Sequence, residues 1–268
     1  MEVGILRRAD ALKRADVRVC IDEGYRVVGR EALKNNIKLK QLELPYIREI
    51  RASAFCNCTA LKQVNLPSVV IIQKGAFAGC SNLKKVVFPP GLSLIEQAAF
   101  SQCKRLTSAR FEKNRRIREI PARFFAECRT LEELAFPESL EAIREEAFYK
   151  CESLKELKLP KNLKRIGSRA FYQCGLQKLD LPEGLTEIGD SAFLKCKQLE
   201  YVKIPESVQK IGKWAFHGCG KLKVLEIHHD PSEVGEWVTN KNCVIRCRKD
   251  SRMEQYAKEY GMGVEEIG

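Results

Sequence analysis

The sequence predicts a β-rich repeat solenoid, in which short units stack so that their parallel strands form a sheet on one face. Three observations support this prediction. An apolar pattern recurs about every 23 residues, each unit contains a strand-like segment, and a phenylalanine and a cysteine hold the same places in successive units. A single unit of this length cannot bury its own apolar face, so the units must stack to build one continuous core.

The repeat unit reads L-x-x-L-x-L-P-x-x-L-x-x-I-G-x-x-A-F-x-x-C, and residues 154–166 show its first half in full. A degenerate unit precedes the others from Val28, with Leu33 in the phenylalanine position and Asn36 in the cysteine position. The repeated aromatic and thiol positions define a predicted structural core ladder, which consists of Phe55, Phe77, Phe100, Phe125, Phe148, Phe171, Phe193, Phe216, Cys58, Cys80, Cys103, Cys128, Cys151, Cys174, Cys196 and Cys219.

Each part of the unit has a structural interpretation. The alternation in Leu157-x-Leu159 is the period of a strand with one buried face. Pro160 ends that strand, because proline has no N–H to donate to a ladder. The L-x-x-I stretch is expected to turn the chain, and the small alanine lets phenylalanine pack beneath it. Nine such strands, at about 4.8 Å apart, predict a parallel sheet roughly 40 Å long.

The C-terminal part departs from the repeat and is expected to close the open end of the core. Residues 243–247 alternate like a last strand, and residues 252–260 place Met253, Ala257 and Tyr260 on one face of a short helix. The predicted organisation is an N-terminal cap at residues 1–27, a solenoid at residues 28–227 and a C-terminal cap at residues 228–268. All three segments are expected to form one structural domain.

These motifs resemble the BspA-like leucine-rich repeat of bacterial surface antigens over roughly residues 28–227. The resemblance implies a leucine-rich-repeat fold that serves adhesion or other protein binding, often at a cell surface. It implies no catalytic residues.

The cysteines and histidines provide no independent sign of a chemical site. Cysteines in one slot of stacked coils lie a coil spacing apart, which exceeds the roughly 3.5–4.5 Å between Cβ atoms that a disulfide needs. We therefore expect buried free thiols and no disulfides. His228 and His229 are adjacent on an extended chain and point apart, and no C-x-x-C or nucleotide-binding or hydrolase motif is present. The sequence predicts no metal, no cofactor and no catalytic residue.

The outward positions of the predicted strands suggest where a partner binds. Alternating charges at Lys158, Asp180, Lys203 and Glu226 are expected to neutralise one another across neighbouring strands. No such alternation is seen at the centre, where one unit is also two residues longer and forms a basic bulge. The candidate ligand contacts are Lys85, Val87, Arg110, Arg115, Arg116 and Arg118. A merely solvated basic loop is the alternative interpretation of the bulge.

Composition and charge narrow the function further. The chain has 268 residues, and its 47 basic and 35 acidic residues give a net charge of +12, which favours an anionic partner. A nucleic-acid site is not expected, because the basic residues form no stripe and only Tyr201 offers an outward aromatic ring on the strands. No apolar run is long enough to span a membrane. The first residues lack the apolar stretch of a secretory signal, which favours the cytoplasm, or the cell surface if a leader had been removed.

The predicted function is therefore non-catalytic recognition of a macromolecule. The expected mode is protein–protein binding through the exposed sheet face and the basic bulge near residues 110–118, with an acidic partner. A bacterial surface adhesin that contacts host or matrix glycoproteins is the main alternative. An enzyme or a self-associating structural protein is the second.

Overall fold

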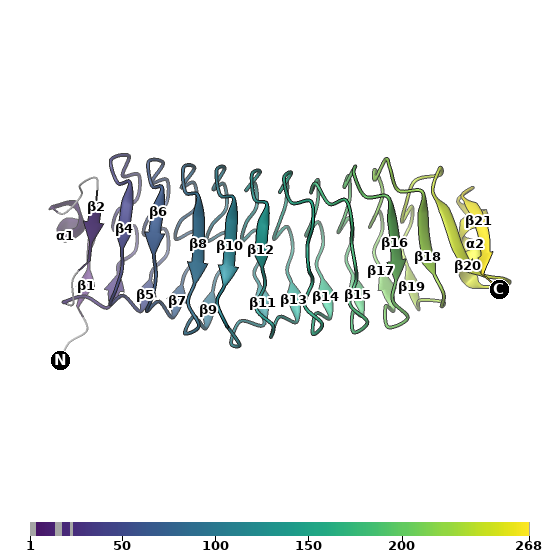
Figure 1. The fold of residues 1–268 in the computed structure, drawn as a ribbon, viewed down its shortest axis with the longest axis horizontal. Coiled ribbons are helices and arrows are strands. Elements are labelled where there is room, and N and C mark those ends of the chain that lie inside the picture. Colours follow the sequence, from purple (N-terminus) through teal and green to yellow (C-terminus); the bar gives the residue numbers. More distant parts are fainter. Residues whose placement is uncertain (1–3, 14–17, 22–23, 268) are drawn as a thin grey trace. The chain divides into compact units, whose positions relative to one another are not determined.

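The structure is a computed structural model that describes residues 4–13, 18–21 and 24–267. The predicted N-terminal cap at residues 1–27 therefore lies partly outside the described residues. The chain divides into two compact units, Met1–Ser139 (unit 1) and Leu140–Gly268 (unit 2), which are described separately. Each unit is a parallel β-solenoid, so the predicted fold class is confirmed (Figure 1).

Each coil of unit 1 contributes two short strands, one to each of two faces. The strands that contain the Leu-x-Leu segment form the Leu-x-Leu face, and they pair in the orders β2-β4-β6 and β8-β10-β12. Their bounds are β2 (Arg18–Cys20), β4 (Gln41–Glu43), β6 (Gln63–Asn65), β8 (Lys85–Phe88), β10 (Ser108–Phe111) and β12 (Glu133–Ala135). The second face is formed by β1 (Ile5–Leu6), β3 (Val27–Val28), β5 (Glu49–Ile50), β7 (Ile71–Ile72), β9 (Leu94–Ile95) and β11 (Glu119–Ile120).

Unit 2 has the same two faces. Its Leu-x-Leu face pairs in the order β16-β18-β20-β21, with bounds β16 (Tyr201–Ile204), β18 (Val224–Ile227), β20 (Val244–Arg248) and β21 (Gly263–Ile267). Its second face comprises β13 (Ala142–Ile143), β14 (Arg165–Ile166), β15 (Glu187–Ile188), β17 (Lys210–Ile211) and β19 (Glu233–Val234).

Two expectations about the strands need correction. The L-x-x-I stretch was expected to be a turn, but it forms the two-residue strands of the second face, where isoleucines such as Ile166 and Ile188 stand in register. The nine expected Leu-x-Leu strands are interrupted, because residues 156–159 and 178–181 do not pair as strands. The link from Cys174 to Leu176 is one residue shorter than the equivalent links in neighbouring coils, but the Gln177 N–H still donates to Lys155 O at 2.9 Å, as in the regular coils.

The core consists of stacked aromatic rings, one from each coil. All eight phenylalanines of the repeat position are fully buried. In unit 2 the rings of Phe171 and Phe193 lie 5.2 Å apart at 3°, and in unit 1 those of Phe55 and Phe77 lie 5.1 Å apart at 14°. The backbone follows the same spacing, since the Phe171 N–H donates to Ala192 O in the next coil. Offset ring pairs add about 0.5–1.5 kcal/mol beyond the apolar area that they bury.

The regular ring stack changes in the coils of unit 1 around residue 111. Phe124 occupies the usual alanine position and makes an edge-on contact with Phe100 at 5.5 Å. The strands compensate, because Ala109 takes a leucine position while Phe88 and Phe111 stack at 4.4 Å. Large and small side chains thus exchange places, which conserves the volume of the core.

The repeat cysteines bind the coils to one another through their thiols. The Cys80 Sγ donates to Phe55 O at 3.2 Å, and the Cys196 Sγ donates to Phe171 O at 3.1 Å. Equivalent bonds from other coils recur at 3.1–3.4 Å. None of the twelve cysteines, all of which lie in the described residues, forms a disulfide. Each of these thiols therefore donates a hydrogen bond to a buried carbonyl oxygen at the turn, and it also packs as a small apolar side chain.

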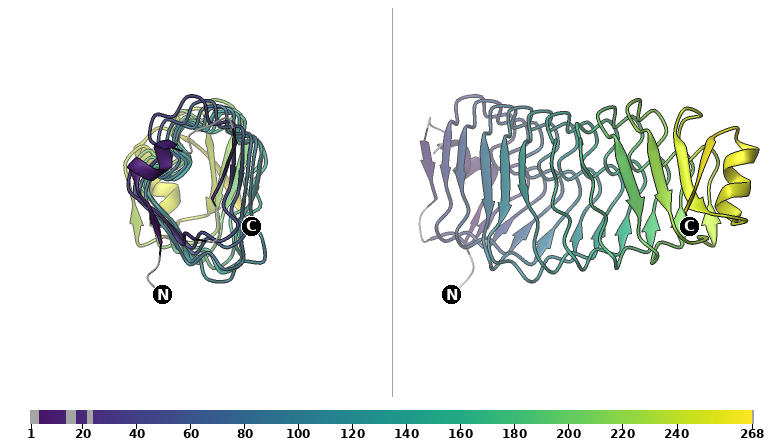
Figure 2. Two further views of the ribbon diagram at one scale, coloured as in Figure 1. Left: turned by 90° about the vertical axis from the view of Figure 1, so that its left-hand side faces the viewer. Right: turned by 45° about the vertical axis from the view of Figure 1, so that its right-hand side comes forward.

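The predicted C-terminal strand and helix are confirmed as β20 and α2 (Arg252–Glu259), and β21 follows them (Figure 2). Helix α2 begins at Ser251, whose Oγ accepts a hydrogen bond from the Glu254 N–H at 3.2 Å. It buries Met253 and Ala257 against the end of unit 2. In unit 1, α1 (Arg8–Lys13) lies between β1 and β2 in sequence. Neither helix has the length and apolar character needed to cross a membrane, within the described residues.

Candidate functional site

Three of the predicted ligand contacts lie exposed on the Leu-x-Leu face of unit 1. Along β8, Lys85 and Val87 are exposed and Val86 and Phe88 are buried, as alternation requires. In register, Arg110 lies between Val87 on one side and Ala135 on the other. Val87 is 43% exposed, which is unusual for a valine. The structure therefore brings Lys85, Val87 and Arg110 together on neighbouring strands.

Arg110 differs from the sequence-based expectation in one respect, because it has an acidic neighbour. Its Nη2 lies 3.1 Å from Glu133 Oε2, a diagonal contact between β10 and β12. The Ser108 Oγ donates to the same carboxylate at 3.1 Å, and Ser108 itself is buried. Hydrogen bonds from Ser108 and Arg110 hold the pKa of the Glu133 carboxyl below its ordinary value. Both charged side chains are 61% exposed, so the ion pair contributes little to stability.

The basic bulge after β10 is anchored by one buried asparagine, Asn114. Its Nδ2 donates to Leu92 O at 2.8 Å and to Pro89 O at 3.2 Å, both in the preceding coil. Its Oδ1 accepts hydrogen bonds from the backbone N–H groups of Arg116 and Ile117 at 2.9 and 3.0 Å. The bulge is therefore fixed to the coil beneath it by a side chain that is only 2% exposed.

The anchor determines how the basic residues are presented. Arg115, Arg116 and Arg118 are exposed around the buried Asn114 and Ile117. They follow β10 directly, so they lie beyond the end of the strand that carries Arg110. The arrangement joins cations, a small apolar surface at Val87 and one carboxylate at Glu133, a mixture typical of protein-binding surfaces.

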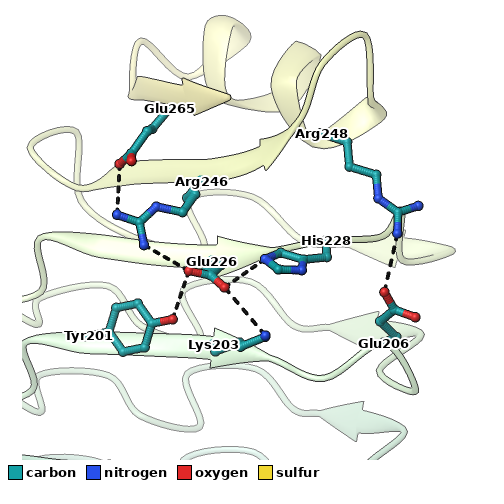
Figure 3. A network of polar contacts seen from close by, with 8 residues as sticks. All are labelled: Tyr201, Lys203, Glu206, Glu226, His228, Arg246, Arg248 and Glu265. Carbon is teal, nitrogen blue, oxygen red and sulfur yellow. Dashed lines mark hydrogen bonds and ion pairs between the residues drawn. The ribbon is translucent and has the colours of Figure 1, made fainter. Parts of the chain in front are cut away.

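The Leu-x-Leu face of unit 2 holds a second polar cluster, centred on Glu226 of β18 (Figure 3). The Glu226 carboxylate accepts a hydrogen bond from the Tyr201 hydroxyl at 2.9 Å, and Arg246 Nη1 lies 2.9 Å from it. Lys203 Nζ lies 3.7 Å away and His228 Nε2 2.7 Å away. Burial alone would raise the pKa of the Glu226 carboxyl, but the hydrogen bonds from Arg246 and Tyr201 outweigh it, so this pKa lies below its ordinary value.

The Glu226 cluster binds its own charges together. Arg246 is shared with Glu265 of β21 at 3.0 Å, so the cluster links four strands, β16, β18, β20 and β21 (Figure 3). The expected mutual neutralisation across this face is thus seen between Lys203 and Glu226. His229 points elsewhere and donates from Nε2 to Val208 O at 2.6 Å. In the described part of the chain, no group of three or more metal-binding side chains gathers.

The sequence analysis missed a row of aromatic and lysine side chains at the turns of unit 2. The rings of Tyr149 and Tyr172 stack at 4.8 Å, and Lys195 Nζ lies 5.9 Å from the Tyr172 ring centroid. Lys213 lies over Trp214 in a later coil at 5.3 Å. These aromatic rings lie next to the Ala-Phe pair in sequence, outside the strands that the sequence analysis considered. Tyr149 and Tyr172 each cover one face of the other ring.

Comparison with known families decides the classification. The sequence profile of the BspA-type leucine-rich repeat region, in six copies, matches residues 18–120 and 118–245. The chain belongs to this family. The BspA-type repeat is one coil of the solenoid described above, with its Leu-x-Leu strand, its two-residue strand and its Ala-Phe turn. The match begins at residue 18, ahead of the predicted start of the solenoid at residue 28. Strands β1 and β2, which precede residue 28, already pair with strands of the next coil.

Solved structures share the BspA-type fold with this chain. A leucine-rich repeat protein from Bacteroides ovatus is 20% identical, with a TM-score of 0.56, over 91% of this chain and 88% of that chain. The pneumococcal vaccine antigen PcpA is also 20% identical, with a TM-score of 0.60, over 92% of this chain and 73% of that chain. A leucine-rich repeat protein from T. pallidum is 25% identical, with a TM-score of 0.50, over 76% and 82%. A comparison with curated protein sequences found no significant match.

The BspA-type assignment and the geometry agree on the class of function. Leucine-rich repeat folds of this kind are typical of protein-binding and adhesin-like surface proteins, and they are generally not catalytic. The solenoid offers extended, mixed surfaces on regular strands, which suits recognition.

Proposed function

We propose that this BspA-type chain is a non-catalytic recognition module whose unit 1 binds an acidic protein partner. The proposed contact surface, the basic patch, consists of Lys85, Val87, Arg110, Arg115, Arg116 and Arg118. Lys85, Val87 and Arg110 lie on β8 and β10, and the three other arginines lie on the bulge beyond β10. The anchoring of the bulge by Asn114 is the observation that carries the proposal.

The anchor matters because it reduces the entropic cost of binding. The backbone of a solvated loop would have to be ordered when the partner binds, which opposes association by about 1–2 kcal/mol for each residue fixed. Asn114 already holds the backbone on both sides of Arg115 and Arg116. The long arginine side chains remain mobile, but their attachment points are fixed relative to Arg110. An acidic partner would meet a preformed cationic surface with a small apolar contact at Val87.

The proposal can be tested by charge reversal with a matched control. In the patch variant, Lys85, Arg110 and Arg116 are replaced by glutamate. In the control variant, the equally charged and exposed Lys38, Lys62 and Lys104 are replaced by glutamate, so the net charge changes by the same amount. Partners captured from lysate on immobilised protein are quantified by mass spectrometry. We expect at least a tenfold loss of one acidic partner with the patch variant and retention with the control.

Equal loss with both variants would show that net charge alone drives capture, and equal retention would exclude the patch. Immobilised matrix glycoproteins, assayed with the same variants, test the alternative of an adhesin.

A further inference from the structure

In unit 1, one corner of the solenoid carries positive charge and no acidic residue. The corner lies where each coil enters its Leu-x-Leu strand, and in four successive coils it comprises residues 36–40, 59–63, 81–85 and 104–108. None of these residues is an aspartate or a glutamate. Besides Lys85 of the basic patch, they include six exposed cations: Lys38, Lys40, Lys62, Lys84, Lys104 and Arg105. We call these six residues the lysine corner.

Backbone hydrogen bonds hold three of these lysines in register, one in each coil. The Lys62 N–H donates to Lys40 O at 2.8 Å, and the Lys84 N–H donates to Lys62 O at 3.3 Å. Each lysine immediately precedes a strand, and these strands, β4, β6 and β8, are neighbours (Figure 1). The three side chains are therefore attached about 4.8 Å apart along the solenoid. The expectation that the basic residues form no stripe is wrong at this corner, which lies just outside the outward strand positions.

The cations of the lysine corner have no acidic partner among the described residues. The carboxylates on adjoining strands are engaged elsewhere, since Glu43 lies 4.0 Å from Arg18 and Glu133 lies 3.1 Å from Arg110. Like charges opposite one another on neighbouring strands are destabilising. The positions of unit 2 that correspond to the three stacked lysines mix their charges and hold Lys155, Gln177, Glu200 and Lys223. An external anion would relieve the repulsion in unit 1.

Neutral polar side chains flank the stacked lysines. The amides of Gln41 and Gln63 stand in register on β4 and β6, and the hydroxyls of Thr59 and Ser81 precede the lysines of their coils. Within the described part of the chain, none of these four side chains makes a hydrogen bond. Apart from Ile37, every exposed side chain of the corner is polar, and none is aromatic. The corner therefore offers neither ring faces on which bases stack nor the apolar centre of a protein interface.

We propose that the lysine corner binds a linear sulfated polysaccharide, whose chain runs across the coils. One sugar unit lengthens such a chain by roughly one coil spacing, so a chain with at least one sulfate on each sugar meets a cation in every coil. Lysine is a compact charge without the planar fork of arginine, so it accepts anions from varied directions. The neighbouring amides and hydroxyls can donate to and accept from the sugar hydroxyls. Four coils span about 14 Å, which is the length of about three sugar units.

This inference goes beyond the proposed function, because it concerns another class of ligand, and it does not rest on the basic patch. The first test compares two charge-reversal variants of the full chain. In the corner variant, glutamate replaces the three stacked lysines. In the unit 2 variant, glutamate replaces Lys155, Lys197 and Lys223, which are exposed at the equivalent corner of unit 2, so the net charge falls by the same amount. Binding of a fluorescein-labelled heparin hexasaccharide is measured by fluorescence anisotropy at physiological salt, where the Debye length is about 8 Å.

We expect the corner variant to bind the hexasaccharide about tenfold more weakly than the native chain, and the unit 2 variant to differ by less than about threefold. Equal weakening in both variants would show that net charge alone attracts the polysaccharide and would overturn the proposal, as would unchanged binding in the corner variant. A third variant, with glutamine at the same three corner positions, removes the repulsion between the lysines. It should fold at least as stably as the native chain in urea denaturation and still bind more weakly, so normal binding would contradict the proposal.

Three further probes separate a sulfated polysaccharide from other anions. A desulfated heparin hexasaccharide keeps the sugar chain and its carboxylates, and we expect it not to bind detectably. An oligodeoxythymidylate and a polyglutamate peptide, each with as many negative charges as the sulfated probe, represent nucleic acid and acidic protein and should bind about tenfold more weakly. Equal binding of any of the three would overturn the proposal. The corner variant keeps every residue of the basic patch, so it should still capture the acidic protein partner, and the two proposals can fail independently.

Discussion

Replacing Asn114 with alanine tests whether the bulge of unit 1 is held by its buried anchor. The change removes donors to Leu92 O and Pro89 O and an acceptor for the N–H groups of Arg116 and Ile117. Each hydrogen bond contributes about 0.5–1.5 kcal/mol net, so losing four should lower the free energy of unfolding by about 2–6 kcal/mol. Because the loop would also lose its fixed conformation, partner affinity should fall with stability.

The assay is urea denaturation followed by circular dichroism, with Asn82→Ala as the matched control. Asn82 makes one hydrogen bond from its side chain, to Thr59 O at 2.7 Å, in an exposed position of the same unit. We expect Asn82→Ala to cost less than about 1 kcal/mol. If Asn114→Ala cost no more than this control, the argument that the bulge is preorganised would be wrong.

Three other substitutions or measurements test the remaining structural claims. Burial raises the pKa of the Cys80, Cys103 and Cys196 thiols well above the ordinary value, so native protein should leave these thiols unlabelled at pH 8 while denatured protein exposes all twelve. Above about pH 8.5 the thiols ionise in the unfolded chain but not in the folded one, so the free energy of unfolding should fall as the pH rises beyond that value. A urea midpoint that stays constant from pH 8 to pH 10 would contradict this. Glu226→Ala should cost about 2 kcal/mol, because it removes the acceptor of the Tyr201 hydroxyl and one of the two carboxylates that pair with Arg246. This is much more than the cost of Glu206→Ala, which removes only an exposed pair with Arg248 (Figure 3). Gly212→Ala should cost roughly 1–3 kcal/mol, because its Cβ would lie 2.3 Å from Asp190 N, whereas Gly220→Ala has open space and should be neutral in the same denaturation assay.

The repeat itself could be predicted because its signals are strong and local. Phenylalanine and cysteine recur at fixed intervals, and the alternating leucines show the period of a strand. The second ladder was missed because a two-residue strand such as Arg165–Ile166 is too short to show a period. Strand β21 was missed because Glu265 and Glu266 interrupt any alternation. The division into two caps and a solenoid within one domain stays a prediction.

The candidate site was only partly predictable, because its contacts depend on neighbouring coils. The sequence rule places Lys85, Val87 and Arg110 on the outward face, and the structure exposes them there. The Arg110–Glu133 pair was missed because it runs diagonally between β10 and β12. The residue directly opposite Arg110 is Ala135, and the residue directly opposite Glu133 is Ser108. The role of Asn114 could not be predicted, since it depends on where the carbonyls of Pro89 and Leu92 point.

The most direct test of the recognition proposal is site-specific photo-crosslinking from the centre of the basic patch. A benzoylphenylalanine at position 87, in place of the exposed Val87, is compared with one at position 37, in place of the still more exposed Ile37 of the same unit. We predict that a partner in lysate crosslinks to position 87, that the adduct is lost when Arg110 and Arg116 are replaced by glutamate, and that position 37 gives none. Adducts of equal yield from both positions, or adducts at position 87 that survive the charge reversal, would contradict binding through this patch.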